Sequence, residues 1–272
     1  MKLEGPLEPY QRLFDDLVAV AERDQRIRAL WLSGSLAREV ADVGSDLDLI
    51  IAVADADFEA YAANWRTWLE SITTPLIARE LPGMPGSFTS TNRDCLRLDV
   101  VAERVAELPA SAFRRRIVVF DRDGLDARIP PLDPDPAGPD LDRLAFLAEE
   151  AYRLIAIFPQ AVVGRGDWLL GVSGVGLQRQ LLYDLFVEAN QPLPPMGVKQ
   201  WSAKLTPEQR HVLGALPGMT ADRDSVVAAM RTTVDAWNTA GKATLERLGV
   251  PWPSDLADTA TAYFHRETTS PS

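Results

Sequence analysis

The sequence Leu32-Ser33-Gly34-Ser35 is followed, after ten residues, by Asp46-Leu47-Asp48-Leu49. The apolar run of residues 27–32 predicts a strand that ends at the Gly-Ser turn, and residues 36–39 predict the start of a short helix. Residues 46–53 are rich in Leu, Ile and Val and predict a second strand. This succession of strand, turn, short helix and strand indicates an α/β domain.

The two aspartates are expected to lie on one face of the second strand. Side chains two residues apart on a strand point the same way, so Asp46 and Asp48 face one side, while Leu47, Leu49 and Ile51 face the core. Clustered carboxylates repel each other unless a cation lies between them. Magnesium prefers oxygen ligands and shares its remaining positions with water and phosphate oxygens. The pattern therefore predicts a magnesium site.

A third acidic residue, Asp99, lies on a strand predicted over residues 96–101. If that strand neighbours the one that carries Asp46 and Asp48, all three carboxylates come together. Three carboxylates can hold two metal ions about 4 Å apart, which activate an attacking oxygen and steady a leaving pyrophosphate.

The Gly-Ser turn has the features of a phosphate-binding site. Gly34 lets the backbone approach a phosphate closely, and the turn precedes a helix start, where free N–H groups bind anions. The Ser35 hydroxyl can add a hydrogen bond. Arg38 lies one helical turn further on and can reach a phosphate.

Together these residues resemble the DNA polymerase β-like nucleotidyltransferase superfamily over residues 27–103. Its pattern is a hydrophobic strand, Gly-Ser or Gly-Gly, about ten residues, Asp-X-Asp with X apolar, and a later acidic residue. A helical domain after the α/β domain is similar to the bacterial antibiotic nucleotidyltransferases, especially the aminoglycoside adenylyltransferases. The chain departs from many members at Glu39, where they carry glycine.

The resemblance implies roles for the residues of the motif. Asp46 and Asp48 would bind magnesium, and Asp99 would bind a second ion or act as the catalytic base. Gly34 and Ser35 would hold the terminal phosphates of the nucleotide. The other residues that we predict in this half are Arg38 and Ser45 for the nucleotide, Asp94 and Glu103 as rival bases, and Glu103 also for the substrate.

The C-terminal half supplies further candidates. Lys199 and Lys204 flank Trp201, and a basic residue of the helical domain usually binds the triphosphate in proteins of this architecture; solvated surface lysines are the alternative. Asp184 and Glu188 lie one turn apart on one helix face and can bind the amines of a cationic substrate, or form a solvated face. Asp167 beside a tryptophan raises the same pair of interpretations.

The domain organisation follows from a change of pattern along the chain. Residues 1–129 predict the catalytic α/β domain with a mixed sheet, and the proline-rich residues 130–140 predict a stiff linker. Residues 141–267 predict an all-α helical bundle that binds the substrate, and residues 268–272 a loose tail. The bundle is expected to contain these helices: 141–158, 168–189, one that opens at Thr206 with a capping box, and 223–248.

The composition narrows the class of partner. A net charge of −11 disfavours a long nucleic acid and favours a cationic acceptor, although many acidic proteins use their charge for solubility alone. No apolar run reaches the roughly 20 residues needed to cross a bilayer, no signal pattern opens the chain, and one cysteine excludes an internal disulfide. We therefore expect a cytoplasmic protein; the sequence leaves its oligomeric state open.

The reaction that the resemblance implies is the transfer of a nucleoside monophosphate, AMP from ATP, to a hydroxyl of a small cationic substrate such as an aminoglycoside. Two magnesium ions and ATP would take part, pyrophosphate would leave, and antibiotic resistance would result. Two alternatives stay open at this point. One is a transferase that modifies a protein or a tRNA, as toxin–antitoxin members of the superfamily do. The other is a non-catalytic nucleotide-binding module.

Overall fold

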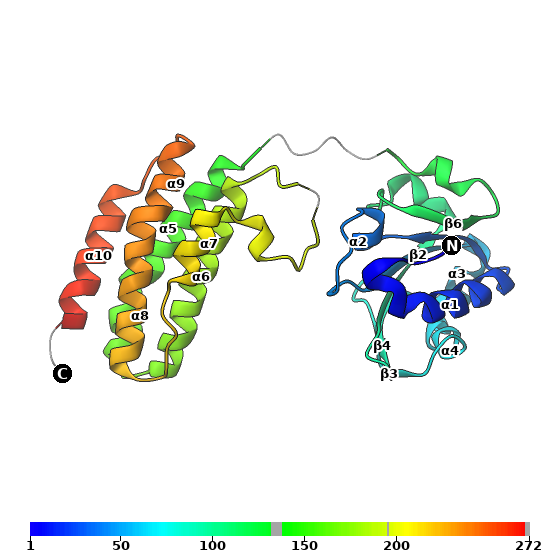
Figure 1. Ribbon diagram of the computed structural model, residues 1–272, viewed down its shortest axis with the longest axis horizontal. Helices are drawn as coiled ribbons and strands as arrows, with labels where there is room; N and C mark the ends of the chain where they lie inside the picture. The colour runs from blue at the N-terminus through cyan, green and yellow to red at the C-terminus, as the bar shows by residue number, and fades with distance from the viewer. Residues whose placement is uncertain (132–137, 195, 270–272) are drawn as a thin grey trace. The chain divides into compact units, whose positions relative to one another are not determined.

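The computed structural model describes residues 1–131, 138–194 and 196–269 (Figure 1). By its internal contacts the chain divides into two compact units, residues 1–134 with 194–199 and residues 135–193 with 200–272. The central part of the predicted linker, residues 132–137, lies outside the described residues, as do residues 270–272 of the predicted tail.

The N-terminal unit is built on a six-stranded sheet in the order β3-β4-β5-β2-β1-β6. β2 and β5 pair in parallel and the other neighbours pair antiparallel, so the sheet is mixed, as the fold class predicted. The strands are β1 (Ile27–Leu32), β2 (Leu47–Val53), β3 (Pro75–Glu80), β4 (Phe88–Asn92), β5 (Arg97–Arg104) and β6 (Ile117–Asp121). The helices are α1 (Gln11–Arg23), α2 (Gly34–Ala37), α3 (Phe58–Ala63) and α4 (Trp65–Glu70), with short 3-10 segments η1 (Gly5–Tyr10), η2 (Asp55–Asp57), η3 (Val105–Ala110) and η4 (Leu125–Arg128).

Alternate side chains along the strands point to opposite faces of this sheet, and each face packs on its own hydrophobic core. Leu47, Leu49 and Ile51 face the larger core, which α1, α3 and α4 cover (Figure 1). Ile50 and Ala52 face a smaller core that is closed by residues of η3 and η4. The inward direction of the three β2 leucine and isoleucine side chains confirms the predicted alternation.

Two strands of this unit are absent from the prediction. β3 lies at the edge of the sheet, and its short apolar run Leu76-Ile77-Ala78 is largely exposed. β4 is mostly small polar residues and has no apolar run that marks a strand. The helical segment after η2 is divided at Asn64 into α3 and α4, and α1 begins at Gln11, directly after η1.

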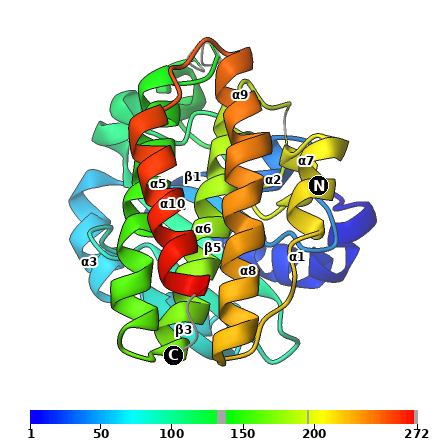
Figure 2. The same ribbon diagram turned by 90° about the vertical axis from the view of Figure 1, so that its left-hand side faces the viewer.

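The C-terminal unit is all helical, as predicted. Its helices are α5 (Leu141–Phe158), α6 (Trp168–Ala189), α7 (Pro207–Gly214), α8 (Arg223–Ala236), α9 (Lys242–Arg247) and α10 (Ser254–Thr269), with η6 (Ser202–Lys204) and the π-helical turns η5 (Pro159–Val163) and η7 (Trp237–Gly241). α10 packs on α5, α5 on α6 and α6 on α8 (Figure 2). Their apolar faces form one core around Tyr152, Phe186 and Trp237.

Local signals explain how these helices begin and end. Thr206 and Gln209 form the predicted capping box at α7, and α5 and α6 match their predicted bounds. The predicted helix 223–248 is interrupted by η7. The tail prediction was wrong at residues 268 and 269, which end α10, because a buried hydroxyl of Thr268 donates back to the Phe264 carbonyl at 2.8 Å and continues the helix.

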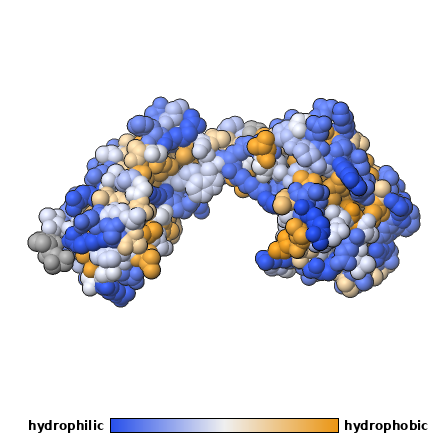
Figure 3. Space-filling model, turned by 60° about the horizontal axis from the view of Figure 1, so that its bottom comes forward, coloured by the Kyte–Doolittle hydropathy of each residue, from blue (hydrophilic) through white to orange (hydrophobic). Residues whose placement is uncertain are grey.

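The face seen in Figure 3 carries hydrophilic side chains interspersed with apolar ones. Among the exposed large apolar side chains are Leu169 and Val198. Among residues 1–131, 138–194 and 196–269, no helix combines the length and the apolar character needed to span a membrane.

Candidate active site

Three carboxylates converge where β2 and β5 begin. The parallel register sets Asp48 directly opposite Asp99, and Asp46 immediately precedes β2. One carboxylate oxygen from each of the three residues lies within 4.8 Å of the others. The sheet therefore brings together the triad that the sequence predicted on the condition that these strands are neighbours.

Burial and mutual repulsion act on this triad. Burial, followed by the charges of Asp46 and Asp99, raises the pKa of Asp48 to about 6, against the opposing charges of Lys199 and Arg38. A bound cation would relieve this repulsion, because carboxylates that share a site disfavour each other's ionised form. The charged state of Asp48 therefore depends on a positive partner.

Two basic side chains contact the triad. The Arg97 guanidinium pairs with Asp46 Oδ2 and lies 3.7 Å from Asp99 Oδ2. Lys199 Nζ lies 3.0 Å from the same oxygen of Asp46, and residues 194–199 group with the N-terminal unit. Lys199 was predicted to bind a triphosphate. Arg97 was missed, although its position two residues before Asp99 on a strand places it on the same face.

Asp99 has a second partner that the sequence did not indicate. The Thr89 hydroxyl on β4 donates to Asp99 Oδ1 at 2.6 Å, because β4 and β5 pair with these two residues opposite each other. This contact could not be predicted, since β4 itself was not recognised as a strand. It fixes the direction of the Asp99 carboxylate.

The Gly-Ser turn lies against the triad. Gly34 has a φ of 59° in the left-handed region, and a Cβ at this position would lie 1.8 Å from Asp48 Oδ2. The Ser33 N–H donates to the Asp48 carbonyl at 2.9 Å, which ties the turn to β2. Only glycine permits this close approach. The helical turn begins at Gly34 itself and not at Leu36.

Around this turn lie polar groups that suit a bound anion. Ser35 is buried, and its Oγ has no hydrogen-bond partner among the described residues; the same holds for Nε of Arg38. Buried polar atoms of this kind are paired in most proteins, by the chain or by ordered water, so these two atoms are available to a bound group. Ser45 differs, because its hydroxyl already accepts from the Asp42 N–H at 2.9 Å and donates to Asp42 Oδ1 at 3.3 Å.

The backbone at Glu39 adopts the conformation of the glycine that many superfamily members carry at this position. The residue has a φ of 60°, the left-handed conformation that glycine adopts without strain. The turn is therefore kept with a non-glycine residue, at a cost of about 1 kcal/mol or somewhat more.

The two rival bases do not join the triad. Glu103 is engaged near the other end of β5, where it accepts from the Ser111 hydroxyl at 2.6 Å and lies 3.7 Å from Arg116, whose side chain is 2% exposed. Burial raises the pKa of Glu103, and these two partners oppose the shift. The role of Glu103 in substrate binding stays a prediction. Asp94 is exposed in the turn after β4.

The candidates of the helical unit are not gathered into one site. Asp167 caps α6 by accepting from the Leu170 N–H at 3.0 Å. Glu188, near the other end of this helix of about 33 Å, accepts from the Asp140 N–H at 2.8 Å and pairs with Arg143 at 3.2 Å. Asp184 accepts from Gln180 at 2.8 Å. Lys204 ends η6.

The residues of the triad fit a divalent cation. Their oxygens are the ligands that Mg²⁺ prefers, and they lie close enough to share an ion. Burial and the charges of Asp46 and Asp99 raise the pKa of Asp48, and a bound cation would oppose that shift. A carboxylate cluster beside a glycine turn with an unpaired serine hydroxyl is suited to a metal ion and a phosphate, as the nucleotidyltransferase pattern predicted.

Comparison with known proteins agrees with this class. Residues 7–131 match the family described as streptomycin adenylyltransferase, a span that contains the triad and the Gly-Ser turn. The structure of an aminoglycoside 6-adenyltransferase from Bacillus subtilis is 16% identical, with 98% of this chain and 100% of that chain covered at a TM-score of 0.42. No curated protein matches. The family match over residues 7–131 agrees with the resemblance to the aminoglycoside adenylyltransferases that the motif indicated.

Proposed function

We propose that this chain transfers AMP from ATP to a hydroxyl of a small cationic acceptor of the aminoglycoside class and releases pyrophosphate. The observation that carries the proposal is the convergence of Asp46, Asp48 and Asp99 beside the Gly34-Ser35 turn. All five residues lie in the span that matches the streptomycin adenylyltransferase family.

In this proposal Asp46 and Asp48 hold Mg²⁺, and the Oδ2 oxygen of Asp99 is kept for the acceptor hydroxyl. The bound metal supplies positive charge that polarises the phosphate to be attacked and steadies the leaving pyrophosphate. The chain's own part is to hold the three carboxylates in place. The backbone N–H of Ser33 fixes Asp48 through its carbonyl, Thr89 fixes Asp99, and Arg97 contacts both Asp46 and Asp99.

The acceptor hydroxyl needs a group that takes its proton. Its oxygen forms a bond to the α-phosphorus of ATP while the bond from that phosphorus to the pyrophosphate oxygen breaks. Asp99 is the base that we propose, because its side chain is 30% exposed, against 12% for Asp46. Thr89 occupies Oδ1, so Oδ2 is the atom that receives the proton. A base within hydrogen-bond reach accelerates such a step by roughly 10²- to 10⁴-fold.

The triphosphate needs donors and positive charge. The unpaired Oγ of Ser35 and the Arg38 guanidinium lie on and after the Gly-Ser turn, and Lys199 already lies at the triad. We propose that these three groups bind phosphate oxygens, since charge-assisted hydrogen bonds to phosphate are the strong ones. The role of Lys204 stays a prediction, as does that of Ser45, whose hydroxyl is engaged in its own turn.

The acceptor is proposed to be cationic because the chain carries a net charge of −11. Among the acidic residues predicted to bind it, Asp184 has the fewest structural contacts, because it accepts one side-chain hydrogen bond and caps no helix. It is the residue of that set that we propose for an amine of the acceptor.

The proposal is tested by pyrophosphate release from ATP and Mg²⁺ with a panel of aminoglycosides, followed by mass spectrometry of the acceptor. We expect release with at least one aminoglycoside and a product heavier by one adenylyl group. GTP, CTP and UTP in parallel reactions test the choice of nucleotide. Absence of release with every aminoglycoside, alongside labelling of a protein or tRNA in cell extract, would replace the acceptor. Absence of all transfer would remove the reaction.

A further inference from the structure

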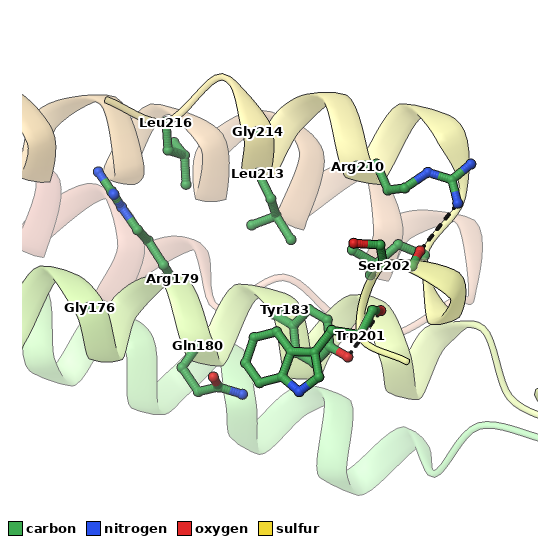
Figure 4. A pocket seen from close by; sticks show the side chains of 11 residues that line it. Gly176, Arg179, Gln180, Tyr183, Trp201, Ser202, Arg210, Leu213, Gly214 and Leu216 are labelled. Carbon is green, nitrogen blue, oxygen red and sulfur yellow. Dashed lines mark hydrogen bonds between the residues drawn. The ribbon is translucent and has the colours of Figure 1, made fainter. Parts of the chain in front are cut away.

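The helical unit contains a pocket of about 410 Å³ to which the proposed transfer reaction assigns no role (Figure 4). It lies between α6 and α7, with η6 at one end, and all its lining residues belong to this unit. Its volume falls in the range of sites for small molecules, about 300–1,000 Å³. None of its described lining residues is acidic, which separates it from the acidic residues predicted to bind a substrate.

An aromatic platform forms one wall of this pocket. The Trp201 indole stacks on the Tyr183 ring with centroids 4.1 Å apart and planes 13° from parallel. The Tyr183 hydroxyl donates to the Trp201 carbonyl at 3.2 Å, which holds the pair together (Figure 4). Trp201 is still 52% exposed. Because Tyr183 covers one face of the indole, the open face is free to stack on a planar ring.

Two arginines lie at opposite ends of the pocket (Figure 4). Arg179 donates to the Pro217 carbonyl at 2.7 Å and Arg210 to the Ser202 carbonyl at 3.2 Å, and neither forms an ion pair within the described part of the chain. Each guanidinium has five N–H donors, so donors remain for a ligand. Burial lowers the pKa of Arg179, and no carboxylate offsets this shift. An anion would supply the missing partner.

Two glycines keep the pocket open. Gly176 on α6 and Gly214 at the end of α7 line it, and a Cβ added to either would meet no atom within 4 Å. Neither glycine has a positive φ, so backbone conformation does not require glycine there. Each position therefore admits a side chain at the lining of the pocket without a clash at Cβ or a strained backbone.

We propose that this pocket is a second ligand site, for a planar aromatic ring that carries an anionic group, such as a nucleoside monophosphate. The ring stacks on Trp201 and the anion pairs with Arg179 or Arg210. The site is built without Asp46, Asp48 or Asp99, and its ligand needs no metal ion. It goes beyond the transfer reaction and does not depend on it.

The test is calorimetric titration of the full chain with AMP in the absence of divalent ions, with adenosine and inorganic phosphate as probes of the two halves. We expect AMP to bind at least about tenfold more tightly than either half, since stacking and charge each contribute about that factor. Trp201→Ala and Arg179→Gln should each weaken AMP about tenfold. Equal affinities for AMP and inorganic phosphate would overturn the proposal that an aromatic ring stacks on Trp201.

Gly214→Leu is the decisive variant, and Gly218→Leu is its matched control. Both glycines have open space around them, but only Gly214 lines the pocket. We expect Gly214→Leu to abolish AMP binding with an unchanged unfolding temperature, and Gly218→Leu to retain it. AMP binding that survives Gly214→Leu but is lost in Asp48→Asn or Ser35→Ala would place the ligand at the triad and overturn the proposal.

The ligand of this pocket can be either the nucleotide that the proposed reaction uses or a separate nucleotide, and competition distinguishes the two. A non-hydrolysable ATP analogue with Mg²⁺ should displace AMP in the first case. In the second case both should bind at once, with a combined stoichiometry of two. The titration requires no turnover, so a failure here would leave the proposed transfer reaction standing, and a failure of transfer would leave this site standing.

Discussion

Acidic side chains gather at one end of the N-terminal sheet, whereas those of helix α6 lie apart. Asp46, Asp48 and Asp99 come within 4.8 Å because two parallel strands place them side by side. Asp167 and Glu188 lie near opposite ends of one helix, and each is bound to a backbone N–H. The difference teaches how to tell the two kinds of acidic residue apart. Like charges that lie together although the fold gains no stability from them indicate a functional site. Acidic side chains that accept hydrogen bonds from helix ends stabilise the fold.

The largest expected effect comes from Asp48→Asn. The change keeps the shape of the side chain but removes a charge from the proposed metal site, and we expect adenylyl transfer to fall by about a thousandfold or more, equivalent to several kcal/mol of lost stabilisation. The same variant should unfold at a higher temperature at pH 7.5 without divalent ions, because burial and two neighbouring charges disfavour the ionised Asp48. Steady-state kinetics and thermal unfolding measure both.

Asp94→Asn is the control for this change. Asp94 is a rival base by sequence, but it is exposed and lies outside the triad. Wild-type transfer is expected. A comparable loss in both variants would remove the distinction between the triad and the surrounding acidic residues.

A smaller loss of adenylyl transfer is expected from Gly34→Ala. The new Cβ would meet Asp48 Oδ2 at 1.8 Å, and φ is 59°, so the Asp48 carboxylate must move and the backbone is strained. Displacement of a reacting group by about 1 Å costs roughly a hundredfold in rate, and the strain costs about 1–3 kcal/mol of stability. Gly44→Ala is the control, because its Cβ would lie 3.4 Å from Asp42 Oδ1, an ordinary contact distance. This variant should change neither the transfer rate nor the stability. Equal activity of both variants would contradict the close approach.

The response to Mg²⁺ should depend on pH. Asp48 has its pKa raised to about 6, so as pH falls from 7.5 to 5 it takes up a proton in the folded chain before an unfolded aspartate does. Without metal, this group's contribution to stability therefore increases on acidification through that window. With metal, the proton competes with Mg²⁺, and affinity at pH 5 should be about tenfold weaker.

Thermal unfolding with and without Mg²⁺ at the two pH values measures this competition. The stabilisation by Mg²⁺ should be clear at pH 7.5 and small at pH 5, and Asp48→Asn should remove most of the difference. A metal-induced shift of the same size at both pH values would show that Asp48 is not a ligand.

The sequence was most informative where function and local pattern coincide. β1, α5 and α6 match their predicted bounds because each is a sharply delimited apolar or amphipathic segment. The triad could be predicted because Asp46 and Asp48 share one strand, and Asp99 lies at the matching position of another. The residues that hold the triad in place could not be predicted. Thr89 lies on a polar strand without an apolar run, so its hydrogen bond to Asp99 depends on a pairing visible only in the folded chain.

In the helical unit, residue type alone was a poor guide. Asp167 and Glu188 were selected as acids that suit a cationic substrate, but an exposed aspartate before a helix is more often its cap. The pocket between α6 and α7 was not predicted, because Arg179, Trp201 and Arg210 come from three separate segments with no shared spacing. Only packing brings them together.

The smallest expected effect sharpens the contrast between the two regions. Asp167→Ala removes the oxygen that accepts from the Leu170 N–H, and loss of such a cap costs about 1 kcal/mol of stability. Asp222→Ala is a matched control, because Asp222 caps α8 in the same way through the Ser225 N–H at 2.9 Å. If both acids serve only their helices, both variants should lose similar stability in denaturant unfolding and keep the wild-type KM for the acceptor. An acceptor KM raised several-fold in Asp167→Ala alone would instead assign Asp167 to the substrate, and the acidic residues of α6 would then belong to the site despite their structural contacts.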